Sequence, residues 1–456
     1  MKLIYGIKDK PKFGQVIVFA IQQLLAIMAA TLVVPVIINT SGSMPEGAPL
    51  MSSAAALFGA GVGTLIYQLF TRFRSPVFLG SSFAFIGSMC AAFAGAVSAQ
   101  AGYLGLIIGA VFAGLIYVLI AIIVKLAGVK WITKLMPAVV IGPTVAIIGL
   151  SLAGNAIGDL QKAPAGGSSY VAIICGLVTL AVTMLCATFG KKMVRLIPFI
   201  IGILSGYAVA TVFTVIGMLA DIPALLVINF EPLTSLFTSF GISSIVAVPD
   251  FTFVEAIKGI KDLDFSFVST IFVAYAPVAF VVFAEHIADH KNLSTIIEKD
   301  LLEDPGLHNT LLGDGIGSIG GALFGGCPNT TYGESVGCVA ITGNASVVTI
   351  TTTAVLAMVI SFISPFVAFV NTIPSCVMGG VCMALYGFIA VSGLKMIQKV
   401  DLEQNRNLFV VSVILIAGIG GLSVSFGKVT LTAIACALIL GILANLMLGV
   451  KDKKGE

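Results

Sequence analysis

Residues 326–337 combine helix-breaking residues with a carboxyl group in a very apolar part of the chain, and read Gly-Cys-Pro-Asn-Thr-Thr-Tyr-Gly-Glu-Ser-Val-Gly. Glycine, proline, asparagine and paired threonines leave backbone groups without helical partners. Such irregular backbone is tolerated at membrane depth only where protein or a cavity covers it. We therefore predict a short extended segment leading into a half-helix near Gly333, whose first N–H groups lie beside the Glu334 carboxylate. This arrangement would bind a small, neutral, polar ring; the alternative is a surface loop with a solvated Glu334.

A second group of ionisable residues follows a long apolar run, at Glu285-His286 and Asp289-His290. Helical spacing puts Glu285 and Asp289 on one face, with His286 and His290 on the next. Two carboxyl groups so near each other in a poor dielectric do not both ionise easily, so that one keeps a proton. We therefore predict Glu285 as the proton-coupling residue, with Asp289 and His290 as the next candidates. The alternative is that Asp289 and His290 already lie in the headgroup layer and only Glu285 is buried. Asp314 is a further acid within an apolar segment.

Three aromatic residues are candidate contacts of a flat ligand. Phe83 follows Gly80-Ser81-Ser82, so it lies where a helix is interrupted and could stack on a ring or form the wall of its site. Tyr332 and Tyr386 are weaker candidates, because tyrosine is common at helix ends and interfaces. For each of them, packing against lipid or core is the alternative.

The sequence lacks the motifs of metal binding, phosphate binding and nucleophilic catalysis. The three histidines and eight cysteines show no zinc-ligand spacing, and the cysteines fall almost wholly inside apolar runs. The sequence contains no phosphate-binding glycine loop and no recognisable nucleophile motif. We therefore predict neither a metal nor a cofactor, and not an enzyme. We do not predict nucleic acid as a partner, because the basic residues lie in loops between apolar segments.

The composition identifies the chain as a membrane protein. Of its 456 residues, 58% are hydrophobic and only 10% are charged, against about 25% charged in soluble proteins. Residues 231–260 are weakly apolar and are predicted to form a long external loop. We predict 14 membrane-spanning segments, near residues 15–38, 50–70, 76–98, 102–124, 135–157, 169–190, 196–218, 266–290, 309–326, 329–349, 350–372, 375–394, 407–425 and 429–449.

The distribution of basic residues supports this count. If the N-terminus is a retained cytoplasmic tail, 20 of the 24 lysines and arginines fall in inner segments and only Lys162, Lys258, Lys261 and Lys428 in outer ones. This asymmetry is typical of polytopic proteins, whose inner loops are the basic ones. We predict a multi-pass protein of the cell membrane with both termini cytoplasmic.

An even number of segments that splits into two sevens predicts two inverted repeats. The third segment is interrupted near Gly80-Ser81-Ser82, and the tenth is interrupted around Pro328 to Gly333. Interrupted segments at corresponding positions of two repeats indicate the binding site of a transporter. The predicted fold is therefore all-α, with broken third and tenth segments that contain short extended stretches.

At these residues the chain resembles the nucleobase–ascorbate transporter family, and within it the bacterial uracil permeases. The resemblance covers nearly the whole chain. Its most specific motifs are Leu-Gly-Ser-Ser-Phe-Ala-Phe at 79–85, Ala-Glu-His at 284–286, Lys-Asp-Leu-Leu-x-Asp-Pro-Gly-Leu-His at 299–308 and Pro-Asn-Thr-Thr-Tyr-Gly-Glu at 328–334. The last motif continues through Ser335-Val336-Gly337 and, after four intervening residues, Thr342.

The resemblance implies a core domain formed by residues 1–134 and 266–374 and a gate domain formed by residues 135–265 and 375–456, in a fold that is often dimeric. It also implies proton symport of a nucleobase, with Glu285 and Glu334 as ligands of the base. Phe83 and Gly333 would supply wall and backbone contacts, and Tyr386 a water-mediated one.

Three positions depart from the family pattern. Ser335 stands where asparagine is usual, Asp289 where uracil permeases carry histidine, and Gln22-Gln23 where they carry Gln-His. Glu334 favours uracil, because purine-specific members have glutamine there. Use of xanthine, or of both bases, stays open, as does a passive solute channel. An anion exchanger is disfavoured, because Glu334 would repel the anion.

Overall fold

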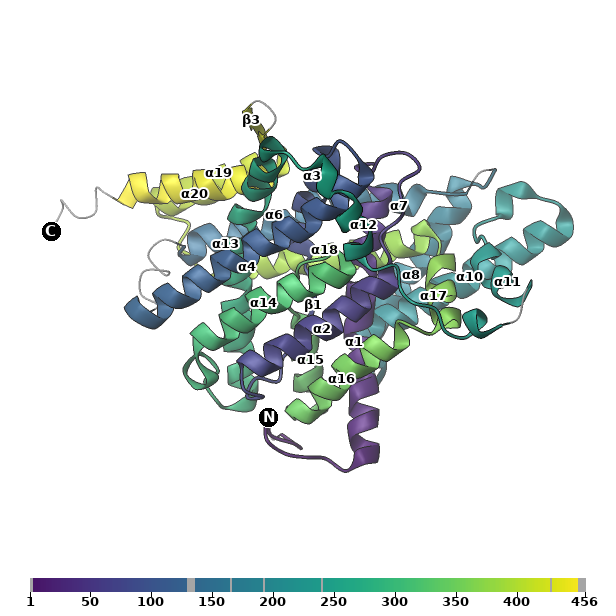
Figure 1. The fold of residues 1–456 in the computed structure, drawn as a ribbon, viewed down its shortest axis with the longest axis horizontal. Coiled ribbons are helices and arrows are strands. Elements are labelled where there is room, and N and C mark those ends of the chain that lie inside the picture. The colour runs from purple at the N-terminus through teal and green to yellow at the C-terminus, as the bar shows by residue number, and fades with distance from the viewer. Residues whose placement is uncertain are drawn as a thin grey trace.

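The computed structural model describes residues 3–128, 136–164, 166–191, 193–238, 241–426 and 429–449, and these residues are mostly helical (Figure 1). The first part of the chain contains α1 (Phe13–Thr40), α2 (Ser53–Phe70), β1 (Leu79–Ser81), the 3-10 turn η1 (Phe83–Phe85), α3 (Ile86–Ala94) and α4 (Ala99–Ala127). The next part contains α6 (Ala138–Ser151), α7 (Ala153–Gln161), α8 (Ser169–Phe189), α9 (Met193–Leu196) and α10 (Pro198–Ala220).

The second half repeats the alternation of long helices and short breaks. It contains α13 (Phe265–Ile297), the turn η5 (Leu302–Gly306), α14 (Leu307–Gly325), β2 (Asn329–Thr331), α15 (Gly333–Thr342), α16 (Val347–Ile360) and α17 (Ser364–Thr372). It ends with α18 (Ser375–Ile397), α19 (Asn405–Ile419), β3 (Val424–Phe426), β4 (Val429–Leu431) and α20 (Ala433–Gly449).

The predicted external loop at 231–260 is not wholly irregular, because it contains the short helices α11 (Glu231–Thr238) and α12 (Thr252–Lys258). The segment predicted at 350–372 is two helices rather than one. α16 ends at Ile360 and α17 begins at Ser364, with Pro365 in its first turn. Proline lacks a backbone N–H and is tolerated at the start of a helix but not within one.

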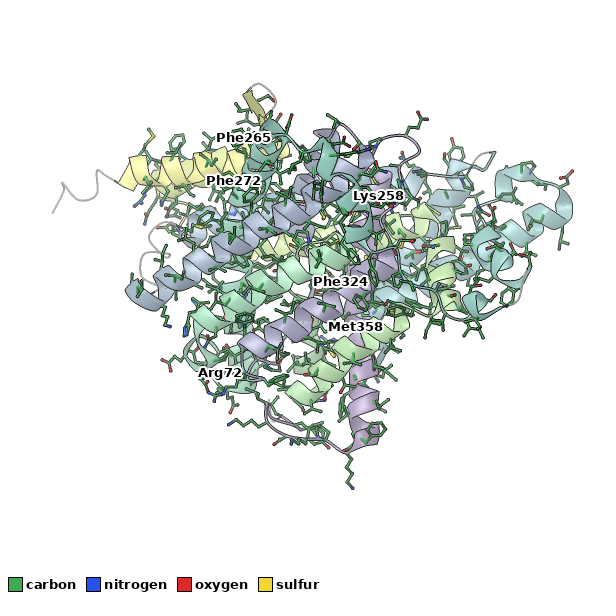
Figure 2. All side chains as sticks on the ribbon, in the orientation of Figure 1. Arg72, Lys258, Phe265, Phe272, Phe324 and Met358 are labelled. Carbon is green, nitrogen blue, oxygen red and sulfur yellow. The ribbon has the colours of Figure 1, made fainter. Side chains whose placement is uncertain are left out.

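Within the described residues, eight helices are long and apolar enough to cross a membrane. Four shorter apolar helices accompany them, at Phe83–Ala94, Val347–Ile360, Asn405–Ile419 and Ala433–Gly449. A multi-pass helical protein is therefore confirmed, whereas the count of 14 and the inverted repeat stay predictions. Figure 2 shows the exposed Phe265 and Phe272 on the outside of the bundle, as expected for side chains that meet lipid.

The helices pack in two groups. In one, α14 lies against α2 and α4, while α16 packs on α1 and α2 (Figure 1). The approach of α2 to α14 is so close that a Cβ on Gly59 would lie 2.4 Å from the Gly321 carbonyl oxygen. In the other group, α18 packs on α6, α7 and α8. There a Cβ on Gly393 would lie 2.3 Å from the Ala146 nitrogen. The assignment of these groups to a core and a gate domain stays a prediction.

Candidate functional site

The two interrupted segments cross at a short antiparallel pair of strands, β1 and β2. Gly80 pairs with Thr330, and Leu79 and Ser81 pair with Thr331 and Asn329. After each strand the chain turns directly into a helix, through η1 and α3 on one side and α15 on the other. The predicted break before Gly333 is therefore confirmed, and its extended stretch is paired with that of the other interrupted segment.

Close packing at this crossing requires a glycine. A Cβ on Gly80 would lie 2.3 Å from the ring of Tyr332, which is far inside van der Waals contact. The Tyr332 hydroxyl donates to the carbonyl oxygen of Ser81 at 2.8 Å. Tyr332 therefore holds the two strands together, and its ring occupies the space that a larger residue at position 80 would need.

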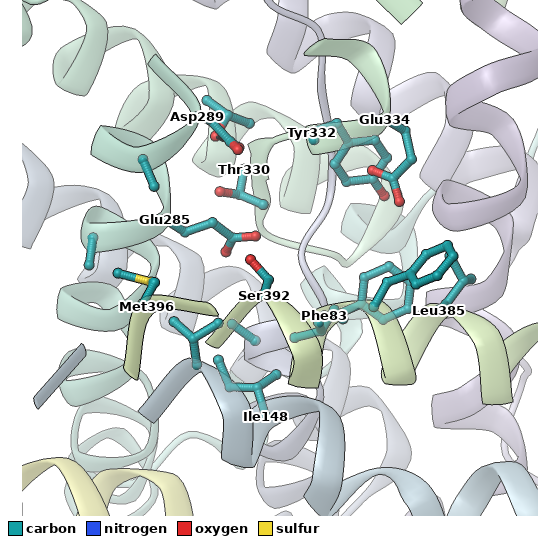
Figure 3. A pocket seen from close by; sticks show the side chains of 18 of the residues that line it. Phe83, Ile148, Glu285, Asp289, Thr330, Tyr332, Glu334, Leu385, Ser392 and Met396 are labelled. Atoms are coloured by element: carbon teal, nitrogen blue, oxygen red, sulfur yellow. Dashed lines mark hydrogen bonds between the residues drawn. The ribbon is translucent and has the colours of Figure 1, made fainter. Parts of the chain in front are cut away.

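A cavity of about 370 Å³ lies beside the crossing, between the two groups of helices (Figure 3). This is within the range of small-molecule sites, about 300–1,000 Å³. Polar residues of α13, β2 and α15 line one side, and α6 and α18 line the other with side chains that are apolar apart from Ser392. The sequence-predicted residues on its wall are Phe83, Glu285, Asp289, Tyr332, Gly333 and Glu334.

Glu285 and Glu334 reach this cavity from different elements. Glu285 lies on α13, and Glu334 lies in the first turn of α15, where a carboxylate is favoured by the helix dipole. Both are half-buried. Figure 3 shows Glu285 and Ser392 pointing toward one another across the cavity, with Ser392 contributed by α18.

Asp289 lies one helical turn after Glu285 and also lines the cavity. Its Oδ2 accepts a hydrogen bond from Thr331 Oγ1 at 2.7 Å. The neighbouring Thr330 hydroxyl is buried at the cavity wall and has no hydrogen-bond partner among the described residues. Thr330 is thus a polar group that the sequence interpretation missed, and its only signal was its place in the interrupted motif.

Gln23 and Ser335, two of the positions that depart from the family pattern, contact each other. The Gln23 amide donates to the Ser335 hydroxyl, which also accepts from the Phe78 N–H at 3.3 Å. Both side chains are buried and neither lines the cavity. The contact ties α1 to the start of α15, so it supports the position of Glu334 from behind.

His286 is fully buried on the neighbouring face of α13, where it contacts α14. Thr310 uses its hydroxyl proton to donate to the Leu307 carbonyl at 3.0 Å, so it accepts from His286 Nε2 at 3.0 Å. His286 Nδ1 lies 2.7 Å from Asp314 Oδ2. Because Nε2 carries a proton, the Nδ1 contact requires one more proton, either on Asp314 or on the ring. The two side chains therefore share one proton.

His290 also points away from the cavity. Its Nδ1 donates to the His286 carbonyl at 2.8 Å, so Nε2 is the acceptor of the Tyr67 hydroxyl at 2.6 Å. Tyr67 in turn accepts from the Ser75 hydroxyl at 2.7 Å. Both nitrogens of His290 are thus occupied inside the protein. The structure brings Glu285 and Asp289 to the site but not His290.

Tyr386 does not line the cavity either, although its neighbour Leu385 does. Its ring packs edge-on against Phe83 with ring centroids 6.1 Å apart. Its hydroxyl is buried without a hydrogen-bond partner among the described residues. In this structure Tyr386 therefore supports the position of the Phe83 ring from behind.

Within the described part of the chain, no group of three or more histidine, cysteine, aspartate or glutamate side chains could hold a metal ion. The eight cysteines are free thiols.

Comparison with known families decides the class of the protein. The Xan_ur_permease model, described as a permease family, matches residues 14–425. The chain belongs to this permease family. Its members are transporters and not enzymes, which confirms the predicted family and class. Two relatives are the uracil permease of Bacillus caldolyticus, 36% identical over 100% of this chain and 97% of its own, and that of Bacillus subtilis, 37% identical over 98% and 95%. The uracil permease of Escherichia coli is 34% identical over 96% and 92%.

Solved structures of transporters share the fold of this permease. The transmembrane domain of a cyanobacterial bicarbonate transporter, BicA, aligns over 96% of this chain and 99% of its own with a TM-score of 0.59 and 15% identity. The murine anion transporter Slc26a9 in its inward-facing state aligns over 98% and 69% with a TM-score of 0.60 and 11% identity. These similarities establish the fold.

Proposed function

We propose that this permease imports uracil together with protons across the cell membrane. The observation that carries the proposal is one cavity, bounded by the starts of two half-helices and by two carboxyl groups from different elements. The relatives named uracil permease support the choice of substrate. Uracil is small, neutral and planar, and offers two ring N–H donors and two carbonyl acceptors.

The polar groups of the cavity complement those of the base. Glu334 accepts from a ring N–H, and N–H groups at the start of α15, which lack partners within the helix, donate to a carbonyl oxygen. The Phe83 ring forms the apolar wall, and the Thr330 hydroxyl supplies a further donor or acceptor. The Tyr332 ring shapes the site without binding the base. Gly333 contributes only its backbone.

Glu285 is the proposed carrier of the coupled proton, with Asp289 as its neighbour. Two carboxyl groups one helical turn apart in a partly dry cavity repel each other when both are ionised, so that one proton is retained. Proton release toward the cytoplasm would then accompany release of the base. His290 has no contact with this cavity, so we do not retain it as a carrier.

We further propose that the two packing groups move relative to each other as core and gate, in a fold of 14 segments and two inverted repeats with both termini cytoplasmic. The cavity lies between the groups, so that such a movement would expose it to either side. We also propose that the permease forms a homodimer in the inner membrane.

The test is uptake of labelled uracil into proteoliposomes under an imposed pH gradient, with unlabelled bases as competitors. We expect accumulation above the external concentration that collapses with a protonophore. Uptake that only equilibrates would identify a passive channel. Stronger competition by xanthine than by uracil would identify a purine symporter.

A further inference from the structure

A second, larger cavity adjoins the candidate site. Its volume is about 840 Å³, and it lies between α13, α18 and the start of α6. The two cavities share four wall residues, Ile141, Ala284, Ala288 and Met396. The two cavities therefore adjoin along a shared wall formed by α6, α13 and α18.

Three lysines line this second cavity: Lys291 in α13, Lys395 in α18 and Lys399 just after α18. All three are exposed. None forms an ion pair within the described residues, and no described acidic side chain is part of the cavity wall. The nearest acidic residues of α13 are Asp289 and Glu285, which line the first cavity instead.

The lysines come from two different packing groups, because α13 packs with α4 and α18 packs with α6 and α8. The excess of basic residues in inner segments explains why lysines occur at this end of the helices. It does not explain why three of them converge on one cavity where no described acidic residue pairs with them. Like charges on its opposite walls repel, and an anion between them would replace repulsion by attraction.

The remainder of the wall suits a ligand with an apolar part. Asn292 and Thr295 supply neutral hydrogen-bonding groups, and the apolar residues include Met136, Pro137, Phe283 and Ile287. Lysine ammonium groups commonly bind phosphate as point charges. The cavity thus combines the features that a phosphate ester with an apolar ring or chain requires.

We propose that the lysine-lined cavity binds the phosphate group of a phosphate ester and that the bound anion links α13 to α18. Such a link holds the two packing groups in one relative position and slows transport. The ester is either a soluble pyrimidine nucleoside monophosphate or a phospholipid headgroup. The nucleotide case rests on the proposed function, since its base would occupy the candidate site while its phosphate meets the lysines.

The first arm of the test uses the full chain in a detergent without anionic lipid. Calorimetry measures binding of uridine 5′-monophosphate, uridine and inorganic phosphate. We expect the monophosphate to bind at least about tenfold more tightly than uridine, as expected for added charge contacts. The double variant Lys291→Gln/Lys395→Gln should lose this margin, and Lys125→Gln, an exposed lysine of α4 outside the cavity, should keep it.

The second arm tests the lipid source in nanodiscs of phosphatidylcholine with or without phosphatidylglycerol. If the headgroup is the ligand, phosphatidylglycerol raises the unfolding temperature of the wild type and of Lys125→Gln but not of the double variant. An effect in either arm supports the proposal and identifies the source. If neither probe distinguishes wild type from the double variant, the proposal is wrong.

Uracil binding by the same preparations separates this inference from the proposed function. We expect the double variant to bind uracil with unchanged affinity, which also shows that it is folded. Normal uracil binding without any phosphate effect would overturn only the inference. A phosphate effect without uracil binding would overturn only the proposed substrate. Lys399→Gln is an independent third variant, with the same expected loss of the phosphate effect.

Discussion

Asp289 Oδ2 accepts a hydrogen bond from Thr331 Oγ1 at 2.7 Å, which joins α13 to the crossing strand β2. The contact uses one carboxylate oxygen of Asp289, and the other has no hydrogen bond to a described residue. It also fixes the face of α13 that bears Glu285 against the interrupted segment that bears Glu334. The hydrogen bond of Asp289 to Thr331 therefore helps to position Glu285 and Glu334, the two carboxyl groups of the proposed mechanism.

Glu334→Gln should weaken uracil binding roughly ten- to a hundredfold. The substitution keeps the size of the side chain, but replaces a charged acceptor by an amide whose NH₂ faces a ring N–H. Hydrogen bonds to charged groups contribute about 1.5–3 kcal/mol, and each 1.4 kcal/mol is about tenfold in affinity. Calorimetry on the solubilised protein measures the change. Asp289→Asn is the matched control and should change affinity much less. Equal uracil affinity in Glu334→Gln and wild type would remove Glu334 from the base contacts.

Glu285→Gln should abolish accumulation of uracil driven by a pH gradient. Glutamine can hydrogen-bond in the cavity but cannot exchange a proton, so coupling is lost while exchange of internal for external uracil continues. Both activities are measured in the same proteoliposomes, and Ser392→Ala, on the facing wall, is the comparison variant that should still accumulate uracil. Accumulation by Glu285→Gln against a gradient would move the coupled proton to Asp289.

Asp314→Asn should be tolerated far better than Asp314→Leu. A neutral pair fits this fully buried place, because ionised groups need further partners there and Asp314 Oδ1 has none among the described residues. Asparagine can donate its amide N–H to His286 Nδ1 as the protonated acid does, whereas leucine leaves Nδ1 unpaired. An unpaired buried polar group costs about 1–3 kcal/mol. Thermal unfolding compares the two variants; equal destabilisation would argue for an ionised pair.

Gly80→Ala should prevent correct assembly of the crossing strands. Its Cβ would meet the Tyr332 ring at 2.3 Å, and the ring is itself held by its hydrogen bond to Ser81. Gly87→Ala in α3 is the control, because a Cβ there has no atom within 4 Å. We expect loss of uracil binding and a lowered unfolding temperature for Gly80→Ala alone. Normal binding by Gly80→Ala would show that the ring can move aside.

The ion pairs of Asp304, in the turn between α13 and α14, should make the stability of the protein depend on pH. Its carboxylate lies 2.7 Å from Lys299 Nζ and 3.0 Å from Arg74 Nη1, and the hydrogen bonds from Lys299 and then Arg74 lower the pKa of this carboxyl. The folded protein thus binds this proton less readily than the unfolded chain does. The stabilisation is complete above the unfolded pKa and is lost as the pH falls through the lowered one.

Asp304→Asn should therefore lower the unfolding temperature near neutral pH by roughly 1–2 °C, since exposed ion pairs contribute less than about 1 kcal/mol. The difference from wild type should vanish in acid. Asp300→Asn is a nearby control without an ion pair in the described residues. A difference between Asp304→Asn and wild type that persists unchanged in acid would contradict this account.

The sequence predicted the faces of α13 correctly, because helical spacing alone separates Glu285 and Asp289 from His286 and His290. It did not predict what those faces contact. Asp314 is 28 residues from His286 along the chain, and only the packing of α14 brings them together. Similarly, Tyr386 shares a helix with Ser392, yet only Ser392 lines the cavity. Neither outcome has a local signal.

By itself the sequence determined the membrane class, the two interruptions and the start of a half-helix at Gly333. These follow from local chemistry: apolar composition, the missing N–H of proline and the positive φ that Gly326 adopts where α14 ends. Only the tertiary structure decided that Gly80 pairs with Thr330, that Gln23 supports Ser335 and that Lys291 faces the same cavity as Lys395. Those contacts join residues about 100 to 310 positions apart, and the packing of whole helices, rather than any neighbouring residue, brings them together.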